Sequence, residues 1–185
     1  MEHVVLGLGS NKSFGAFSSL ELLKRACSCL ADFIHELEVS SIYRTAAMYV
    51  CEQDDFYNMV AVGKFSGTPD SLLEKIHSIE QKFGRNRSLE VRNGPRSLDI
   101  DIELFGNQTV KKENLVIPHE RLLERAFVLA PFLEVLQKNA DVNKADIEFY
   151  GKKLELLKDQ RVEKYCSFQK YCFGVQNGTR TDSLP

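Results

Sequence analysis

The chain has 185 residues, of which 43% are hydrophobic and 27% charged, and its formal net charge is −2. This composition is typical of a soluble globular protein, and the near-neutral charge argues against a generic nucleic-acid binder. No apolar run approaches the roughly 18 residues of a membrane-spanning helix, and the first residues lack the pattern of a secretory signal. Five cysteines without a Cys-x-x-Cys pair favour reduced thiols. We therefore expect a cytoplasmic protein that has neither a membrane nor a nucleic-acid partner.

Hydrophobic periodicity predicts six elements over the first two thirds of the chain. Ser18 or Ser19 is a suitable N-cap for the first helix, and Thr68 followed by Pro69 is a strong start for the second, which Gly84 ends. In chain order, we expect a strand over 4–8, a helix over 20–34, a strand over 37–45, a strand over 56–65, a helix over 69–83 and a strand over 98–105. This βαββαβ order predicts an α/β (α+β) ferredoxin-like fold, an antiparallel sheet with both helices on one face.

The glycine-rich segment 7–12 follows the first strand. A dinucleotide fingerprint needs a third glycine at position 12, where Lys12 stands, so we reject a Rossmann site. Two alternatives stay open: a tight turn whose Ser10 and Asn11 face a neighbouring site, or a plain strand-to-helix turn.

Beyond residue 105 the patterns are weaker. We expect a short strand over 108–110, a helix opening at 118–121 and reaching Leu136 with a break or kink at Pro131, and a charged, partly helical segment over 146–165. The tail 173–185 should be loosely held. We expect a catalytic domain over 1–136 and a C-terminal extension over 137–185, packed on the same domain.

The strand over 98–105 is the most informative stretch. Leu or Ile occupies every even position from 98 to 104, opposite Asp99, Asp101 and Glu103. Asp is unfavourable in strands, and neighbouring same-side residues lie roughly 6.6 Å apart. Two carboxylates at this spacing can converge on one hard cation or on a pair of them. The alternative is a solvated sheet face.

A basic segment precedes this strand. Between positions 82 and 97 it holds Lys82, Arg85, Arg87, Arg92 and Arg96 against Glu90 alone. Arginines beside carboxylate-held magnesium suit a polyphosphate, because both neutralise charge that develops during transfer. A solvated basic loop is the alternative.

Two smaller sets complete the candidates. His119 and Arg125 form a second basic pair, although a single histidine is usually structural. Phe56 and Phe127 can enclose a flat heterocycle while Asn58 pairs with its polar edge, or they are ordinary core residues.

At these residues the chain resembles the 6-hydroxymethyl-7,8-dihydropterin pyrophosphokinases, enzymes of folate biosynthesis. The resemblance covers roughly residues 3–136. Its most specific block is Gly-Pro-Arg-Ser-Leu-Asp-Ile-Asp over 94–101, and the other motifs, in the same order, lie at 9–11, 41–45, 56–58, 84–87, 118–121 and 125–131.

The resemblance implies transfer of the β,γ-diphosphate of ATP to the pterin hydroxymethyl group, with release of AMP. It implies two Mg²⁺ ions on Asp99 and Asp101, with Asp101 as ligand first and possible proton acceptor second. Catalytic roles would fall to Arg85, Arg96 and Asp101. ATP would be bound by Glu80, Arg85, Arg87, Arg96, His119 and Arg125, and the pterin by Thr45, Phe56, Asn58 and Phe127.

Segment 46–49 lacks two prolines that are common in this family, and Asn93 stands where an aromatic residue can cover the site, so looser loop closure is expected. Two rival functions stay open: a non-catalytic ferredoxin-like ligand-binding or assembly module, and a two-metal phosphohydrolase. A monomer or a weak homo-oligomer is expected.

Overall fold

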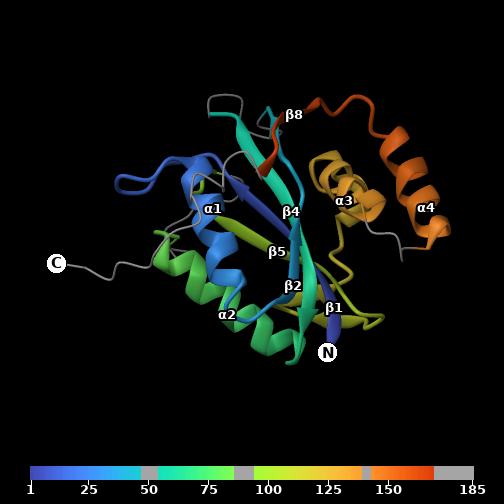
Figure 1. Ribbon diagram of the computed structural model, residues 1–185, viewed down its shortest axis with the longest axis horizontal. Helices are drawn as coiled ribbons and strands as arrows, with labels where there is room; N and C mark the ends of the chain where they lie inside the picture. The colour runs from blue at the N-terminus through green and yellow to red at the C-terminus, as the bar shows by residue number, and fades with distance from the viewer. Residues whose placement is uncertain (47–53, 86–93, 139–142, 169–185) are drawn as a thin grey trace, which may run out of the picture.

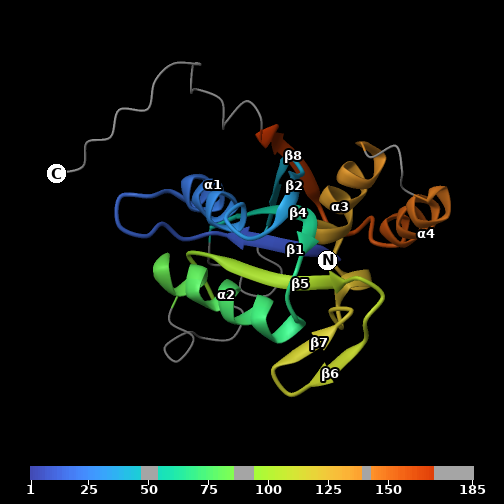
Figure 2. The same ribbon diagram turned by 60° about the horizontal axis from the view of Figure 1, so that its bottom comes forward.

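The structure, a computed structural model, describes residues 1–46, 54–85, 94–138 and 143–168. A six-stranded antiparallel sheet runs through its centre in the order β5-β1-β4-β3-β8, and β2 also pairs with β4 (Figures 1 and 2). Its strands are β1 (Glu2–Ser10), β2 (His35–Val39), β3 (Ile42–Thr45), β4 (Phe56–Phe65), β5 (Asp99–Phe105) and β8 (Val162–Cys166). The predicted ferredoxin-like fold is confirmed, and β5, the last strand of the βαββαβ unit, lies beside β1.

Helices α1 (Ser19–Leu30) and α2 (Pro69–Lys82) begin where the sequence predicts. Ser18 accepts from the Glu21 amide while the Glu21 side chain reaches back to Ser18, and Thr68 forms the same kind of capping box. Each box satisfies amide groups that the first helical turn leaves without intrahelical partners. The first helix ends earlier than predicted, at Leu30, so that the buried Ile34 lies in the connection to β2.

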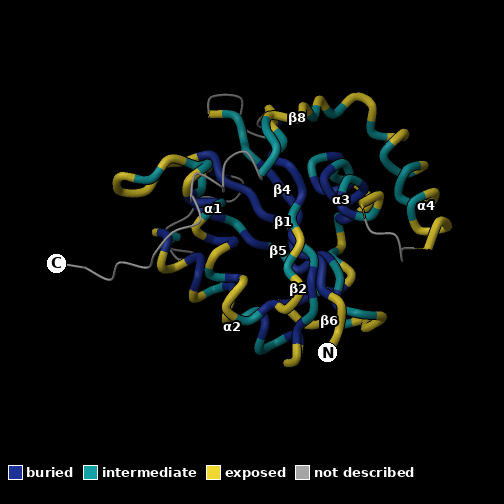
Figure 3. Tube along the Cα trace, viewed as in Figure 1, coloured by how far each residue is buried: buried dark blue, intermediate teal, exposed yellow. Residues whose placement is uncertain are grey.

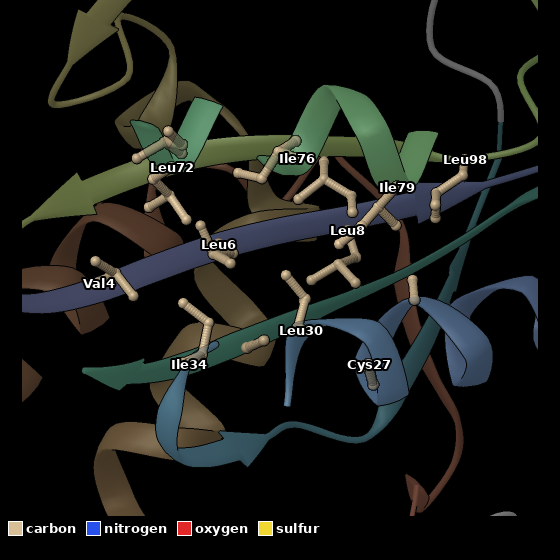
Figure 4. Close-up of a cluster of buried hydrophobic side chains, with 14 of the residues drawn as sticks. Val4, Leu6, Leu8, Cys27, Leu30, Ile34, Leu72, Ile76, Ile79 and Leu98 are labelled. Atoms are coloured by element: carbon tan, nitrogen blue, oxygen red, sulfur yellow. The ribbon is translucent and has the colours of Figure 1, made fainter. Parts of the chain in front are cut away.

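The main hydrophobic core lies between the sheet and these two helices. Figure 4 shows Leu6 and Leu8 of β1 between Leu30 of α1 and Ile76 of α2, and all four belong to one buried cluster. The outer sides of the helices are exposed, whereas the central strands are buried (Figure 3). Burying these apolar side chains is the dominant stabilising contribution to such a fold.

The opposite face of the sheet is covered by α3 (Ala126–Lys138) (Figure 1). A short 3-10 helix, η1 (Leu122–Glu124), precedes it. Leu129 and Phe132 of α3 pack on Val5 and Val60 of the sheet. The helix expected from 118–121 begins only at Ala126, and it continues through Pro131 without a break. The described helices include no candidate for a membrane span.

Two expectations about strands need correction. The predicted strand 37–45 is two strands, because at its middle Ser40 Oγ accepts from the Val60 amide and the Ser41 amide donates to Glu134. The Ser40 amide still donates to the Val60 carbonyl, so the side-chain bonds replace only part of the ladder pairing at that point. The strand expected over 108–110 is one side of a small hairpin of β6 (Val110–Lys112) and β7 (Leu115–Ile117).

The described part of the C-terminal extension packs on the rest of the fold. Helix α4 (Lys144–Glu155) lies beside α3, where Tyr150 and Leu154 join the second hydrophobic cluster. Strand β8, which the sequence did not predict, then pairs with β3 at the sheet edge. Segment 146–165 is therefore partly helical, as predicted, but it also completes the sheet. The division at residue 136 stays a prediction, and the tail 173–185 lies outside the described residues.

Candidate functional site

A pocket opens on the α3 face of the sheet, where β1, β3, β4, β5 and the start of α3 converge. Eight of the predicted site residues line it: Thr45, Phe56, Asn58, Arg96, Asp99, Asp101, Arg125 and Phe127. They come from four separate segments of sequence, and the antiparallel sheet brings them to one place.

Two glycines form part of the pocket floor. In β1, Leu6 and Leu8 face the main core, so Gly7 and Gly9 stand on the pocket side. A Cβ atom at Gly7 would come within 2.9 Å of a Glu103 oxygen, and one at Gly9 within 3.0 Å of the Asn58 side chain. Larger residues here would displace site side chains. The strand continues through Ser10, so the tight turn predicted within 7–12 is wrong for its first four residues.

Asp99 lies between two arginines at one end of the pocket. Its carboxylate accepts from Arg85 and Arg96, and Arg85 also bonds to Glu80. Burial acts to raise the pKa of Asp99, but the two guanidinium groups outweigh it and the pKa is lowered. Asp99 is thus held as a carboxylate.

Asp101, two residues further along β5, has different partners. Arg125 Nη1 donates to its Oδ2 over 2.9 Å, and His119 Nε2 lies 3.9 Å from the same oxygen. The Arg121 amide donates to His119 Nδ1, which leaves the proton of the neutral ring on Nε2, toward Asp101. Burial lowers the pKa of His119, although Asp101 opposes this. The imidazole is therefore biased toward its neutral form.

Glu103 is the unusual member of the acidic face. Its side chain is 0% exposed, and neither carboxylate oxygen has a hydrogen-bond partner within the described residues. Burial, and then the nearby Asp101, raise its pKa to about 8, although Arg125 Nη1, 3.9 Å away, opposes them. Glu103 is accordingly protonated at neutral pH.

A β-bulge lies at Glu103 in β5 and changes the side on which the next residue points. Leu6 is opposite Ile102 but Val5 is opposite Leu104, so β5 has one extra residue at this point. Leu104 therefore joins the cluster under α3 instead of the main core. The prediction that Leu104 shares a side with Ile102 is wrong, because strict alternation does not survive a bulge.

The other end of the pocket is apolar with a polar edge. Phe56 and Phe127 line it, and Asn58 Nδ2 donates to Thr45 Oγ1 over 2.9 Å. This bond fixes the orientation of the Asn58 amide, so that its carbonyl oxygen is set to accept a hydrogen bond. Asn58 and Thr45 are both buried.

The structure places the remaining predicted residues differently. Glu80 is 1% exposed and accepts from the Ile100 amide and from Arg85. Arg85 donates to Asp99. Glu80, Arg85 and His119 are not among the residues that line the pocket. Their contacts with a nucleotide stay predictions. Arg87, like segment 47–49 and Asn93, lies outside the described residues.

Asn11 supports the site in a way that the sequence left open. Its backbone N–H donates to the Arg96 carbonyl over 3.1 Å, and its side-chain oxygen accepts from the backbone N–H of Arg96 over 2.8 Å. It thereby fixes the backbone from which Arg96 reaches Asp99. Glu103 and Arg121 also line the pocket without having been predicted as site residues; the acidic alternation was the only signal for Glu103.

The fold and the pocket define a ferredoxin-like α/β domain whose ligand site combines paired carboxylates, arginines and aromatic side chains. The sequence model of the family 7,8-dihydro-6-hydroxymethylpterin-pyrophosphokinase (HPPK) matches residues 5–137. The chain belongs to this family.

Individual relatives agree with that membership. A 2-amino-4-hydroxy-6-hydroxymethyldihydropteridine pyrophosphokinase of Bacillus subtilis is 46% identical over 101 residues, which cover 55% of this chain and 59% of the relative. The protein of the same name from Aquifex aeolicus is 33% identical, over 73% of this chain and 81% of its own length. A mitochondrial folate synthesis bifunctional protein of Arabidopsis thaliana is 38% identical over 76% of this chain.

A crystal structure of Plasmodium falciparum HPPK-DHPS has the same fold, with a TM-score of 0.58 and 16% identity over 86% of this chain and 45% of the other. Several relatives are much longer than the region of similarity. The match spans 24% of the Arabidopsis protein and 17% of a Pneumocystis carinii folic acid synthesis protein.

Proposed function

We propose that this chain transfers the β,γ-diphosphate of ATP to 6-hydroxymethyl-7,8-dihydropterin and releases AMP, as a step of folate biosynthesis. One observation carries the proposal: Asp99 and Asp101, each bonded to arginine, share a pocket with Phe56 and Phe127. A charged end for a polyphosphate and an aromatic end for a flat ring meet in this pocket. Family membership supports the same activity.

The donor set fits magnesium. Mg²⁺ prefers carboxylate oxygens, and Asp99 and Asp101 offer them from side chains that are 20% and 34% exposed. Both carboxylates have cationic partners in the pocket, and arginine contacts of this kind can pass to phosphate oxygens when metal and nucleotide bind. We propose that these two residues hold two Mg²⁺ ions, which would neutralise phosphate charge and lower the pKa of the substrate hydroxyl.

The residues of the chain would then perform positioning and charge neutralisation. Arg96 and Arg125 line the pocket next to the carboxylates and can move their guanidinium groups to phosphate oxygens, for which their planar forks are suited. Arg85, anchored by Glu80, would keep Asp99 ionised. Transfer requires little more than in-line placement and stabilisation of developing charge.

The ring-binding end would select the second substrate. Phe56 and Phe127 would enclose the pterin, while the Asn58 carbonyl oxygen and the backbone near Thr45 would pair with its amide edge. The bond from Asn58 to Thr45 supports this assignment, because it holds the amide in one orientation without help from a ligand. A pre-organised polar group reduces the entropy cost of binding.

The decisive assay combines ATP, Mg²⁺ and the hydroxymethyl dihydropterin, and follows both nucleotide and pterin products. We expect AMP to form in step with a pterin diphosphate. Asp101→Asn should reduce turnover by orders of magnitude. Asp70→Asn is the matched control, because Asp70 pairs with Lys112 at an exposed site on α2, and it should leave turnover unchanged. Formation of ADP, or ATP hydrolysis without pterin, would contradict the proposal.

A cytoplasmic location is also part of the proposal. The bacterial relatives support it, whereas the names of the Arabidopsis and pea relatives include a mitochondrial location. No feature of the pocket favours the binding-module or phosphohydrolase alternatives over diphosphate transfer.

A further inference from the structure

Gln160 contacts the backbone on both sides of a site residue, Arg125. It lies in the turn between α4 and β8, beyond the region 5–137 that the family model matches. Its Nε2 donates to the Glu124 carbonyl over 2.8 Å, and its Oε1 accepts from the Ala126 amide over 2.9 Å. One side chain therefore brackets Arg125 from the C-terminal extension.

Gln160 also provides a hydrogen-bond acceptor at the start of helix α3. Ala126 begins the helix, where amide groups lack intrahelical acceptors, and the preceding Arg125 has no side-chain acceptor with which to cap it. Gln160 supplies an acceptor from 34 residues away in the sequence. It acts as a remote N-cap.

The segment after Gln160 pairs with β3, the strand that ends at the pocket residue Thr45. Two residues beyond Gln160, Val162 pairs with Thr45 at the end of β3. Three residues further, the Tyr165 ring packs edge-on against Tyr57 of β4, at 5.1 Å between centroids, on the face of the sheet away from the pocket. Residues 160–165 thus touch both the start of α3 and the strands that carry Thr45 and its neighbours.

From these contacts we infer that the C-terminal extension is part of the site: Gln160 is a positioning residue that holds Arg125 and the adjacent Phe127 against the pocket. Arg125 is the residue that acts, through its bond to Asp101 and its place over the Phe127 ring. The functional part of this inference rests on the proposed diphosphate transfer, since Arg125 is assigned there to the nucleotide. The bracket itself does not.

The first test is independent of activity. In full-length Gln160→Ala, hydrogen exchange at the Ala126 amide should accelerate at least tenfold, while exchange at Leu129 inside α3 stays near the wild-type rate. Gln160→Glu keeps the acceptor for Ala126 and should restore most of the protection. Lys158→Ala, at an exposed position in the same turn, should match the wild type. Unchanged exchange at Ala126 in Gln160→Ala would overturn the bracket.

The second test concerns function. We expect Gln160→Ala to raise the KM for ATP, and the Kd for a non-hydrolysable ATP analogue with Mg²⁺, about tenfold, with kcat changed less than threefold and Gln160→Glu close to wild type. Accelerated exchange with unchanged KM and Kd would overturn the positioning role. If the wild type makes no pterin diphosphate, the proposed function fails, and the exchange at Ala126 alone then supports or overturns the bracket.

Discussion

The buried Glu103 carboxyl makes the stability of the protein fall as pH rises through neutrality. Its pKa is raised from an ordinary 4.5 to about 8, so between these values the folded chain keeps a proton that the unfolded chain has released. Stability falls with pH wherever the folded state binds more protons. Each pH unit within the window is worth about 1.4 kcal/mol. Between pH 5 and pH 8 the wild type should therefore lose about 3 to 4 kcal/mol through this residue.

Glu103→Gln isolates this effect, because glutamine has almost the same shape and no charge to acquire. The difference in unfolding free energy between variant and wild type should grow by about 3 kcal/mol from pH 5 to pH 8. Unfolding in urea is followed by far-UV circular dichroism, because the chain has no tryptophan for a fluorescence signal. EDTA in the buffer keeps metal ions from binding to Asp101. Taking the difference cancels the other titrating groups. A difference that is the same at every pH would refute the reasoning and indicate an ionised Glu103 paired with Arg125.

Three further predictions concern other charged groups. The pKa of Glu134 is lowered to about 2, so its stabilising effect is present above pH 4.5 and lost toward pH 2. In urea titrations, Glu134→Gln should lower the unfolding free energy by about 2 kcal/mol at pH 7 and by less at pH 3. An equal loss at both pH values would contradict this. Glu80→Ala leaves Arg85, 7% exposed, without one carboxylate and should lower unfolding free energy by about 3 kcal/mol, whereas the exposed Glu74→Ala on the same helix should not. Arg96→Ala should slow turnover about 100-fold while weakening pterin binding less; normal turnover would remove it from the transition state.

The predictability of the site differed between its two ends. The carboxylates were visible in the sequence because Asp99 and Asp101 lie on one face of a strand, where Asp is unfavourable. Phe56, Asn58 and Phe127 were not distinguishable from core residues by pattern, and they were singled out through the family resemblance. The structure shows that they line the same pocket, whereas their roles toward a pterin stay predictions.

The errors have a common origin in long-range contacts. The strand expected over 37–45 is divided because Ser40 and Ser41 bond to Val60 and Glu134, which are distant in sequence. Strand β8 exists because the open edge of β3 offers it a partner. Neither feature leaves a local signal, because strand pairing depends on the neighbour that the fold provides.

The sequence alone determined the order of helices and strands up to residue 105, except for the division of the strand 37–45, since periodicity and capping residues act within a few positions of each other. It also determined which strand carries the acidic face. Only the tertiary structure decided that a bulge accompanies the burial of Glu103, that Asn11 fixes Arg96, and that Gln160 brackets Arg125. These contacts join residues from distant parts of the chain. Their geometry depends on the packing of the whole sheet and not on any local pattern.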